Sequence, residues 1–283
     1  MEKKISLVLE GGGMRGAYTA GCLSWLLDNN IEFNCGYGIS TGAVYLTAFI
    51  KKDKEFLKKT STDIICDKTV LGLSPCLREG RLVGYDYLFK HHLKETCNFD
   101  IGDIKKETDA KAKYGVYSLN AGKTEYIELK DMNMDLLKAA CTLPIIGKRV
   151  KVDGKVYLDG GITKMIPIEE AIDDGCDKHL IITTKPLHYV RKPAKGIVVW
   201  LMKKFYPECQ NISKDYKVRH LNYQKQIDII NQLKDEGKAI YRYPSKEIPV
   251  SRLRGNKKDL TELFELGRSD MEAIKEDIFN LVK

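Results

Sequence analysis

The chain has 283 residues and a formal net charge of +8, which favours anionic partners such as phospholipid headgroups or nucleic acid. Its length is enough to bury a sizeable hydrophobic core, and its composition is ordinary for a globular protein. No apolar run approaches the roughly 20 residues that a membrane-spanning helix needs, which argues against an integral membrane protein.

The first predicted elements are a strand, a glycine-rich turn and a helix. Residues 5–9 (ISLVL) form an apolar, partly β-branched run that is typical of a buried strand. The sequence GGGMRG at 11–16 follows directly, and neither a strand interior nor a helix interior tolerates such a run of glycines. Residues 17–27 then show the apolar spacing of a helix.

A second strand is predicted over 33–39, and it ends in the sequence GISTG at 38–42. A helix is predicted to follow over 43–51. A G-x-S-x-G at a strand-to-helix junction is typical of a nucleophile elbow, in which the serine adopts a strained backbone conformation. The N-terminus of the following helix would face any anion formed at Ser40.

The glycine turn allows two interpretations. Gly11, Gly13 and Gly16 spell the G-x-G-x-x-G of dinucleotide-binding folds, which would make the protein a nucleotide-binding oxidoreductase. That function also needs an acidic residue at the end of the second strand, but Glu32 precedes the strand and Ser40 follows it. Free backbone N–H groups close to a serine are instead what an oxyanion hole requires, so acyl transfer is favoured.

The rest of the chain continues to alternate helices and strands. Residues 69–84 are expected to be irregular and are a candidate substrate entrance. The remaining expected elements are helices over 52–67, 85–95, 134–142, 166–173, 214–234 and 260–281, and strands over 113–119, 124–129, 150–158, 179–184 and 239–243, with a hairpin turn at 120–123 and a break at 153–154.

Three sequence blocks resemble the signature blocks of patatin-like phospholipases. They are GGGMRG at 11–16, GISTG at 38–42 and Asp159-Gly160-Gly161, in the family's order. The stretch AACTLP at 139–144 resembles a further family block but departs from it at two positions, where serine and alanine are usual. The resemblance covers roughly residues 5–185, and residues 237–252 are similar to a small C-terminal segment of a bacterial subgroup.

The resemblance implies a fold and a set of site residues. The implied fold is α/β, a three-layer patatin-like fold with a mostly parallel central sheet and helices on both faces. The implied catalytic pair is Ser40 as nucleophile and Asp159 as base, without metal or cofactor. Backbone N–H groups of Gly11, Gly12 and Gly13, with that of Thr41 in addition, are expected to form the oxyanion hole, and the expected supporting residues are Arg15, Gly16, Gly38, Gly42 and Gly160.

A catalytic histidine is the alternative to this dyad. Among the five histidines only His188 follows Asp159 in a predicted loop, as the chain order of a Ser-Asp-His triad requires. A dyad has its own requirement, because a free aspartate titrates near 4 and is a weak base for a hydroxyl group. Asp159 is therefore expected to be buried, which raises the pKa of a carboxyl group.

The sequence thus predicts a serine lipid acyl hydrolase with a catalytic domain at 1–186 and a helical, short-stranded extension at 187–283 packed on it. The alternative from another class is a lipid-binding or regulatory patatin-fold protein with little turnover. The eight dispersed cysteines, with no C-x-x-C pair, favour a cytoplasmic location and neither disulfides nor a zinc site. No nucleic-acid partner is expected.

The stretch 186–206 mixes basic and aromatic residues. One hypothesis is a peripheral contact with an anionic membrane at the inner face, with Trp200, Phe205 and Tyr206 at the interface. The other is that residues 197–202 pack on the core and the lysines are simply solvated.

Overall fold

The computed structural model describes residues 3–283 and contains an 8-stranded sheet. The strand order is β5-β6-β3-β2-β1-β7-β8, and β4 pairs with β3 beside this path. The strands are β1 (Ile5–Leu9), β2 (Cys35–Ile39), β3 (Lys111–Ser118), β4 (Lys123–Glu128), β5 (Val150–Val152), β6 (Lys155–Asp159), β7 (Lys178–Ile182) and β8 (Ala239–Arg242).

The centre of the sheet is parallel, as predicted. β1 pairs in parallel with β2 and β7, β2 with β3, and β7 with β8, whereas β4, β5 and β6 make the antiparallel pairs. All five residues of β1 and of β2 are buried, because helices cover both faces of these strands. Their side chains alternate between the faces, so Leu7 and Leu9 join one hydrophobic core and Val8 joins the other.

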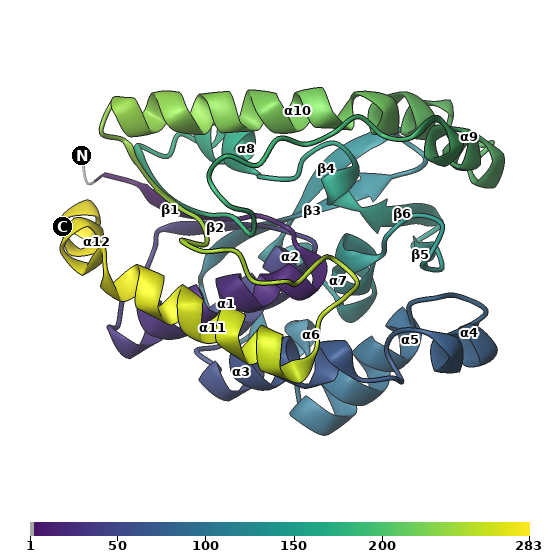
Figure 1. Cartoon of the computed structure of the whole chain (residues 1–283), viewed down its shortest axis with the longest axis horizontal. Helices are drawn as coiled ribbons and strands as arrows, with labels where there is room; N and C mark the ends of the chain where they lie inside the picture. Colours follow the sequence, from purple (N-terminus) through teal and green to yellow (C-terminus); the bar gives the residue numbers. More distant parts are fainter. Residues whose placement is uncertain (1–2) are drawn as a thin grey trace.

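Helices lie on both sides of the sheet, which gives the expected three layers (Figure 1). α8 (Ile168–Asp173) and α10 (Gln210–Asp235) cover one face. The other face is covered by α1 (Gly16–Asp28), α2 (Thr41–Ile50), α3 (Lys54–Thr62), α7 (Met134–Cys141) and α11 (Lys257–Glu272).

The C-terminal part is joined to both the sheet and the larger core. β8 extends the sheet beside β7, and α11 packs along α1. Polar contacts between the two helices include Tyr18 Oη to Asp270 (2.9 Å) and Trp25 Nε1 to Glu272 (2.6 Å). Residues far apart in the sequence therefore stabilise the helix that follows the glycine turn.

The structure differs from the sequence-based expectation in several elements. The segment 69–84 is not wholly irregular, since it contains α4 (Leu73–Glu79). The expected helix over 260–281 is divided into α11 and α12 (Lys275–Val282), because Ile274 leaves the helical conformation (φ −120°, ψ 24°) and redirects the chain so that α12 buries its own apolar side chains. The helix following α5 (Tyr85–Tyr87) is a π-helix over Leu88–Thr96. The short helix α6 (Ile101–Ile104) was not predicted.

The basic and aromatic stretch contains α9 (Gly196–Phe205), which lies at one end of the molecule (Figure 1). The stretch agrees in part with a membrane contact and in part with packing on the core. Ile197, Trp200 and Phe205 are exposed, whereas Met202 is buried. Tyr206 is buried too, and its hydroxyl group accepts a hydrogen bond from the backbone N–H of Ile145 (2.9 Å), so it is not available to a membrane surface. No helix among residues 3–283 is long and apolar enough to cross a membrane.

Candidate active site

The sheet brings Ser40 and Asp159 together through β3. One edge of β3 pairs with β4 over residues 113–118. The other edge of β3 therefore pairs with both β2 and β6. Ile39, at the end of β2, lies opposite Gly115, and Asp159, at the end of β6, lies opposite the next residue, Val116. The ends of two strands that are 120 residues apart in the sequence therefore meet at one point of the sheet edge.

Ser40 has the backbone conformation of a nucleophile elbow. It lies between β2 and α2 with φ 57° and ψ −129°, a conformation that costs a non-glycine residue free energy. The residue is 8% exposed and lies at the N-terminus of α2. The fold thus holds the hydroxyl group at the junction that the sequence predicted, with the positive end of the helix dipole directed at it.

Asp159 is 3% exposed, and its carboxylate accepts a hydrogen bond from the backbone N–H of Gly161 at 2.7 Å. The hydroxyl group of Ser40 is near enough to this carboxylate to lower its pKa. The backbone N–H of Asp159 in turn donates to the carbonyl of Thr142 (2.9 Å), which lies in the AACTLP stretch. Burial raises the pKa of Asp159, although the Ser40 hydroxyl group, the N–H of Gly161 and the charges of Arg219 and Arg252 oppose the shift.

The glycine turn passes directly beside Ser40. A Cβ atom on Gly11 would lie 2.6 Å from the Cβ atom of Ser40, so the turn could not approach so closely with a side chain there. The N–H of Gly11 donates to the carbonyl of Met165 (3.4 Å), and that of Gly12 donates to Thr41 Oγ1 (3.1 Å). Within residues 3–283, the N–H groups of Gly13 and Thr41 have no hydrogen-bond partner. These two donors remain available to a ligand.

Gly13 depends on its lack of a side chain. Its φ is +58°, and a Cβ atom would lie 2.4 Å from the backbone oxygen of Arg252. That same oxygen accepts a hydrogen bond from the N–H of Met14 (3.0 Å). The C-terminal part of the chain therefore holds the glycine turn in place.

The other expected supporting residues lie around this centre. Gly16 begins α1, Gly38 lies within β2, Gly42 lies in the first turn of α2, and Gly160 follows β6. The Nε atom of Arg15 is buried and has no hydrogen-bond partner within residues 3–283. Burial lowers the pKa of Arg15, while the nearby Glu10 carboxylate raises it.

A buried ion pair that sequence analysis did not predict supports the turn. Glu10 precedes the glycines and forms a short contact with Lys185 Nζ, and it also accepts hydrogen bonds from the N–H (2.7 Å) and Oγ1 (2.9 Å) of Thr184. Burial favours the neutral form of both charged groups. The charge of Lys185 nevertheless holds the pKa of Glu10 below its usual value, whereas burial lowers the pKa of Lys185 to about 7.

Ser40 and Asp159 line an apolar pocket, and both are near its polar end. Many of its walls are hydrophobic side chains, among them Met14, Val44, Tyr45, Ile64, Ile65, Val70, Leu71, Val83, Tyr85, Leu88, Phe89, Leu93 and Leu143. The candidate entrance segment contributes Val70, Leu71 and Val83, and the π-helix contributes Leu88, Phe89 and Leu93. The pocket therefore presents apolar walls to a group held against Ser40.

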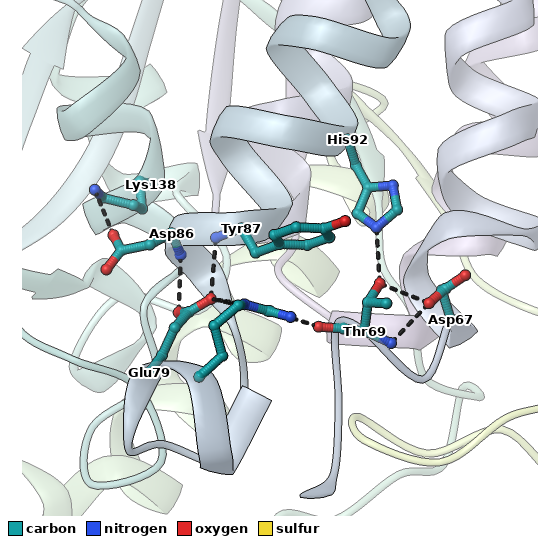
Figure 2. Close-up of polar contacts among 8 residues, drawn as sticks. Asp67, Thr69, Glu79, Asp86, Tyr87, His92 and Lys138 are labelled. Atoms are coloured by element: carbon teal, nitrogen blue, oxygen red, sulfur yellow. Dashed lines mark hydrogen bonds and ion pairs between the residues drawn. The ribbon is translucent and has the colours of Figure 1, made fainter. Parts of the chain in front are cut away.

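A polar network ties the entrance segment to the helices beside it (Figure 2). The carboxylate of Glu79, at the end of α4, accepts hydrogen bonds from the N–H groups of Asp86 (3.1 Å) and Tyr87 (3.0 Å). Thr69 Oγ1 bonds to His92 Nε2 (2.9 Å) and to Asp67 (2.6 Å). Both ends of the segment are thus fixed to the scaffold that lines the pocket.

None of the five histidines is among the residues that line this pocket. His188, the candidate triad base, is exposed. His179 bonds to Ser6 Oγ (2.8 Å), at residues where β1 and β7 begin. Nor do three His, Cys, Asp or Glu side chains gather in a metal-binding arrangement within the described residues.

The structure also brings three arginines to the pocket that sequence analysis did not select. Arg191 lies in the loop after β7, Arg219 lies on α10, and Arg252 lies in the loop before α11. Each is separated from the signature blocks by many residues, and basic residues are frequent throughout this chain. No sequence signal distinguished them from solvated side chains.

The chain is similar to several known proteins. Over 279 residues the chain is 26% identical to uncharacterized protein YjjU of Escherichia coli (strain K12), covering 94% of this chain and 75% of that protein. It is 29% identical over 235 residues to probable lipid hydrolase 463L of invertebrate iridescent virus 6, covering 77% and 76% of the two chains. The crystal structure of VipD from Legionella pneumophila shares the fold with a TM-score of 0.53 and 11% identity, covering 99% of this chain and 67% of that one.

Family assignment accounts for most of the chain. Residues 209–283 match a domain of unknown function, DUF6363. Residues 7–172, which contain the glycine turn, Ser40 and Asp159, match the patatin-like phospholipases. On this match and on the fold, the protein belongs to the patatin-like phospholipase family.

Proposed function

We propose that the protein is a serine lipid acyl hydrolase, which cleaves carboxylic ester bonds of lipids through a Ser40–Asp159 dyad. The observation that carries the proposal is that these two buried side chains interact and line the same apolar pocket beside the glycine turn. Family membership and the likeness to a probable lipid hydrolase support it. The pocket supplies what a lipid ester needs, an apolar wall for the acyl chain beside a nucleophile.

In the acylation step, the Asp159 carboxylate takes the proton of the Ser40 hydroxyl group while Oγ attacks the ester carbonyl carbon. The carbonyl oxygen becomes an oxyanion, and the unpartnered N–H groups of Gly13 and Thr41 are the donors we assign to it. When the intermediate collapses, the bond to the alcohol breaks, and Asp159 returns its proton to the leaving oxygen. An acyl group remains on Ser40.

Deacylation repeats these roles with water as the nucleophile. Asp159 takes a proton from the water, and the hydroxide adds to the acyl carbon. Collapse breaks the bond to Ser40 Oγ, which regains the proton, and the fatty acid leaves. The raised pKa of Asp159 supports this role, because a carboxylate with a higher pKa is a stronger base.

Reaction with a fluorophosphonate probe, followed by hydrolysis of a panel of esters, tests the proposal. We expect Ser40→Ala to abolish both labelling and hydrolysis, since no other residue forms the acyl-enzyme. Ser269→Ala is the matched control, because Ser269 is exposed on α11, and it should retain both. Labelling that survives in Ser40→Ala would contradict the assignment.

The panel also separates the alternatives. A folded wild-type protein that binds lipid but neither reacts with the probe nor hydrolyses any ester would be a lipid-binding or regulatory protein. The oxidoreductase alternative has no support in the site, because the residue after β2 is Ser40 and not an acidic residue that could hold a ribose.

A further inference from the structure

Three arginines line the pocket that contains Ser40, and their charges are poorly compensated. Within residues 3–283, none of the carboxylates pairs within 4 Å of Arg191, Arg219 or Arg252, although salt bridges are frequent elsewhere on the surface. The carboxylate of Asp159 interacts electrostatically with both Arg219 and Arg252. The polar end of the pocket therefore has an excess of positive charge.

The contacts of these side chains hold two of them in place without using all their donors. Arg219 Nε donates to the carbonyl of Gly161 (2.6 Å), next to the catalytic pair. The guanidinium groups of Arg219 and Arg191 lie over the rings of Tyr216 (5.4 Å) and Tyr223 (5.0 Å). Aromatic rings orient a guanidinium group but do not neutralise it or accept its in-plane hydrogen bonds, which are left for a ligand.

Two further observations about the arginines favour an anionic ligand. The Nε atom of Arg191 is buried and has no hydrogen-bond partner within the described residues. A buried donor of this kind costs free energy unless a ligand or water satisfies it. Burial, together with the positive charges of Arg252 and Arg191, lowers the pKa of Arg219 well below its ordinary value, so binding an anion here would relieve mutual repulsion.

We infer that Arg191, Arg219 and Arg252 form a subsite for the phosphate of an acidic glycerophospholipid, a headgroup that contains no ammonium group. This inference rests on the proposed function, since it names the lipid class that the Ser40 site takes. In such a lipid, the phosphate and an ester lie on neighbouring glycerol carbons, which matches an arginine cluster beside Ser40. An ammonium group of a zwitterionic headgroup would instead meet three positive charges.

The subsite also gives a role to the C-terminal part of the chain. Arg219 and Arg252 lie within residues 209–283, the region that matches the domain of unknown function. Arg191 comes from the loop that connects β7 to α9. The family's signature blocks supply the reacting groups, and the C-terminal part supplies the charges that select the headgroup.

Binding is tested in the Ser40→Ala background, which keeps hydrolysis out of the measurement. Calorimetric titration with octyl phosphate should give a dissociation constant at least about tenfold lower than titration with octyl phosphocholine. Arg191→Gln should weaken octyl phosphate binding by about tenfold or more, whereas Lys192→Gln, its exposed neighbour, should change it less than about twofold. Equal affinity for the two ligands, or an equal loss in both variants, would overturn the inference.

Inorganic phosphate distinguishes the two sources of this chemistry. If it binds as tightly as octyl phosphate, the ligand is a free phosphate and not a lipid headgroup. This binding arm is independent of turnover, so it can succeed even if the protein proves not to be a hydrolase, and the two proposals fail separately.

The kinetic arm uses dioctanoyl lipids in micelles of a neutral detergent. The ratio of kcat/KM for phosphatidic acid to that for phosphatidylcholine should exceed about tenfold in the wild type. Arg252→Gln should lower this ratio by about tenfold, mainly through KM, and Arg254→Gln, exposed on the same loop, should leave it nearly unchanged. Arg219 is not used as a test, because it also holds Gly161. A ratio near one in the wild type, or one that Arg252→Gln leaves unchanged, would overturn the inference.

Discussion

Asp159 is placed where its neutral form is favoured, although the proposed reaction requires its carboxylate. Burial raises its pKa, whereas the hydroxyl group of Ser40, the N–H of Gly161 and two arginines lower the pKa and so oppose part of this shift. The balance produces a base stronger than a free aspartate. Asp159 is therefore buried, as a Ser–Asp dyad requires if its aspartate is to be a stronger base than a free one.

This balance predicts the pH dependence of hydrolysis. The carboxylate is the active form, so a raised pKa moves the loss of activity on acidification to a higher pH than an ordinary aspartate would give. We expect kcat/KM for a soluble neutral ester to fall on one acidic limb above pH 4, measured from about pH 4 to 9. Full activity down to pH 4 would contradict a buried aspartate base.

Substitution of the pair gives a second prediction. Asp159→Asn retains the shape but removes the base, so kcat should fall by orders of magnitude while the protein stays folded. Members of one catalytic unit are not additive, so the double variant with Ser40→Ala should be barely worse than either single variant. His188→Ala should change the rate only within a few-fold, since this side chain is exposed outside the pocket. A loss as deep as that of Asp159→Asn would identify a histidine base.

A third prediction concerns stability. Lys185→Met leaves the Glu10 carboxylate buried without its counterion, which should cost about 3–5 kcal/mol of the free energy of unfolding. Adding Glu10→Gln removes the unpaired charge and should recover part of that loss. Lys238→Met, in an exposed pair, should change stability little. Urea denaturation measures all three, and a loss from Lys185→Met no larger than from Lys238→Met would contradict the role of the buried pair.

How well each site residue could be predicted from the sequence depends on how far along the chain its partners lie. Ser40 and the glycine turn lie within one strand–turn–helix pattern, and Asp159 precedes two glycines, so local motifs were enough to select them as candidates. The partners of Glu10 and the arginines around Asp159 are more than 30 residues away in sequence. Their roles depend on burial and on neighbours that only the folded chain brings together.

At the scale of elements, the strands were predicted more accurately than some of the helices. Strands with continuous apolar runs, such as β1 and β7, were predicted within a residue or two at each end. α9 was not predicted, because its apolar residues are largely exposed and give no clear buried face. The split between α11 and α12 was missed because neither proline nor glycine marks Ile274.

The entrance segment provides a prediction at this scale. Glu79→Ala removes the acceptor for the N–H groups of Asp86 and Tyr87 (Figure 2). This change should destabilise the protein by about 1–2 kcal/mol and loosen the wall formed by Leu71 and Val83. We expect kcat/KM to fall for long-chain esters and to change little for short ones. Glu95→Gln, in an exposed pair on the π-helix, is the control. An equal loss with all chain lengths would argue against a role for this wall in holding the chain.

At the scale of the whole molecule, exposed apolar residues gather at one end. α4 exposes Leu73 (83%) and Leu77 (89%), and α9 exposes Ile197 (59%) and Trp200 (53%), and both helices lie at the same end of the long axis (Figure 1). Lys203 and Lys204 are exposed on α9 beside them. Exposed apolar side chains flanked by basic ones are typical of a surface that binds an anionic membrane.

We therefore propose that this end docks on anionic membranes and brings the pocket to its lipid substrate. Transfer of a large apolar side chain out of water is favourable by about 1.5–3 kcal/mol of free energy. Trp200→Ser or Leu77→Ser should therefore each reduce partitioning onto vesicles that contain phosphatidylglycerol by about tenfold or more. Ile172→Ser, at an exposed apolar residue on α8, is the matched control and should not. Co-sedimentation measures the partitioning. The lysines contribute about 1 kcal/mol each near a charged surface, so binding should also weaken with salt and with a smaller anionic fraction. Binding that ignores both, or that the control weakens equally, would show that this end of the molecule is not the docking surface.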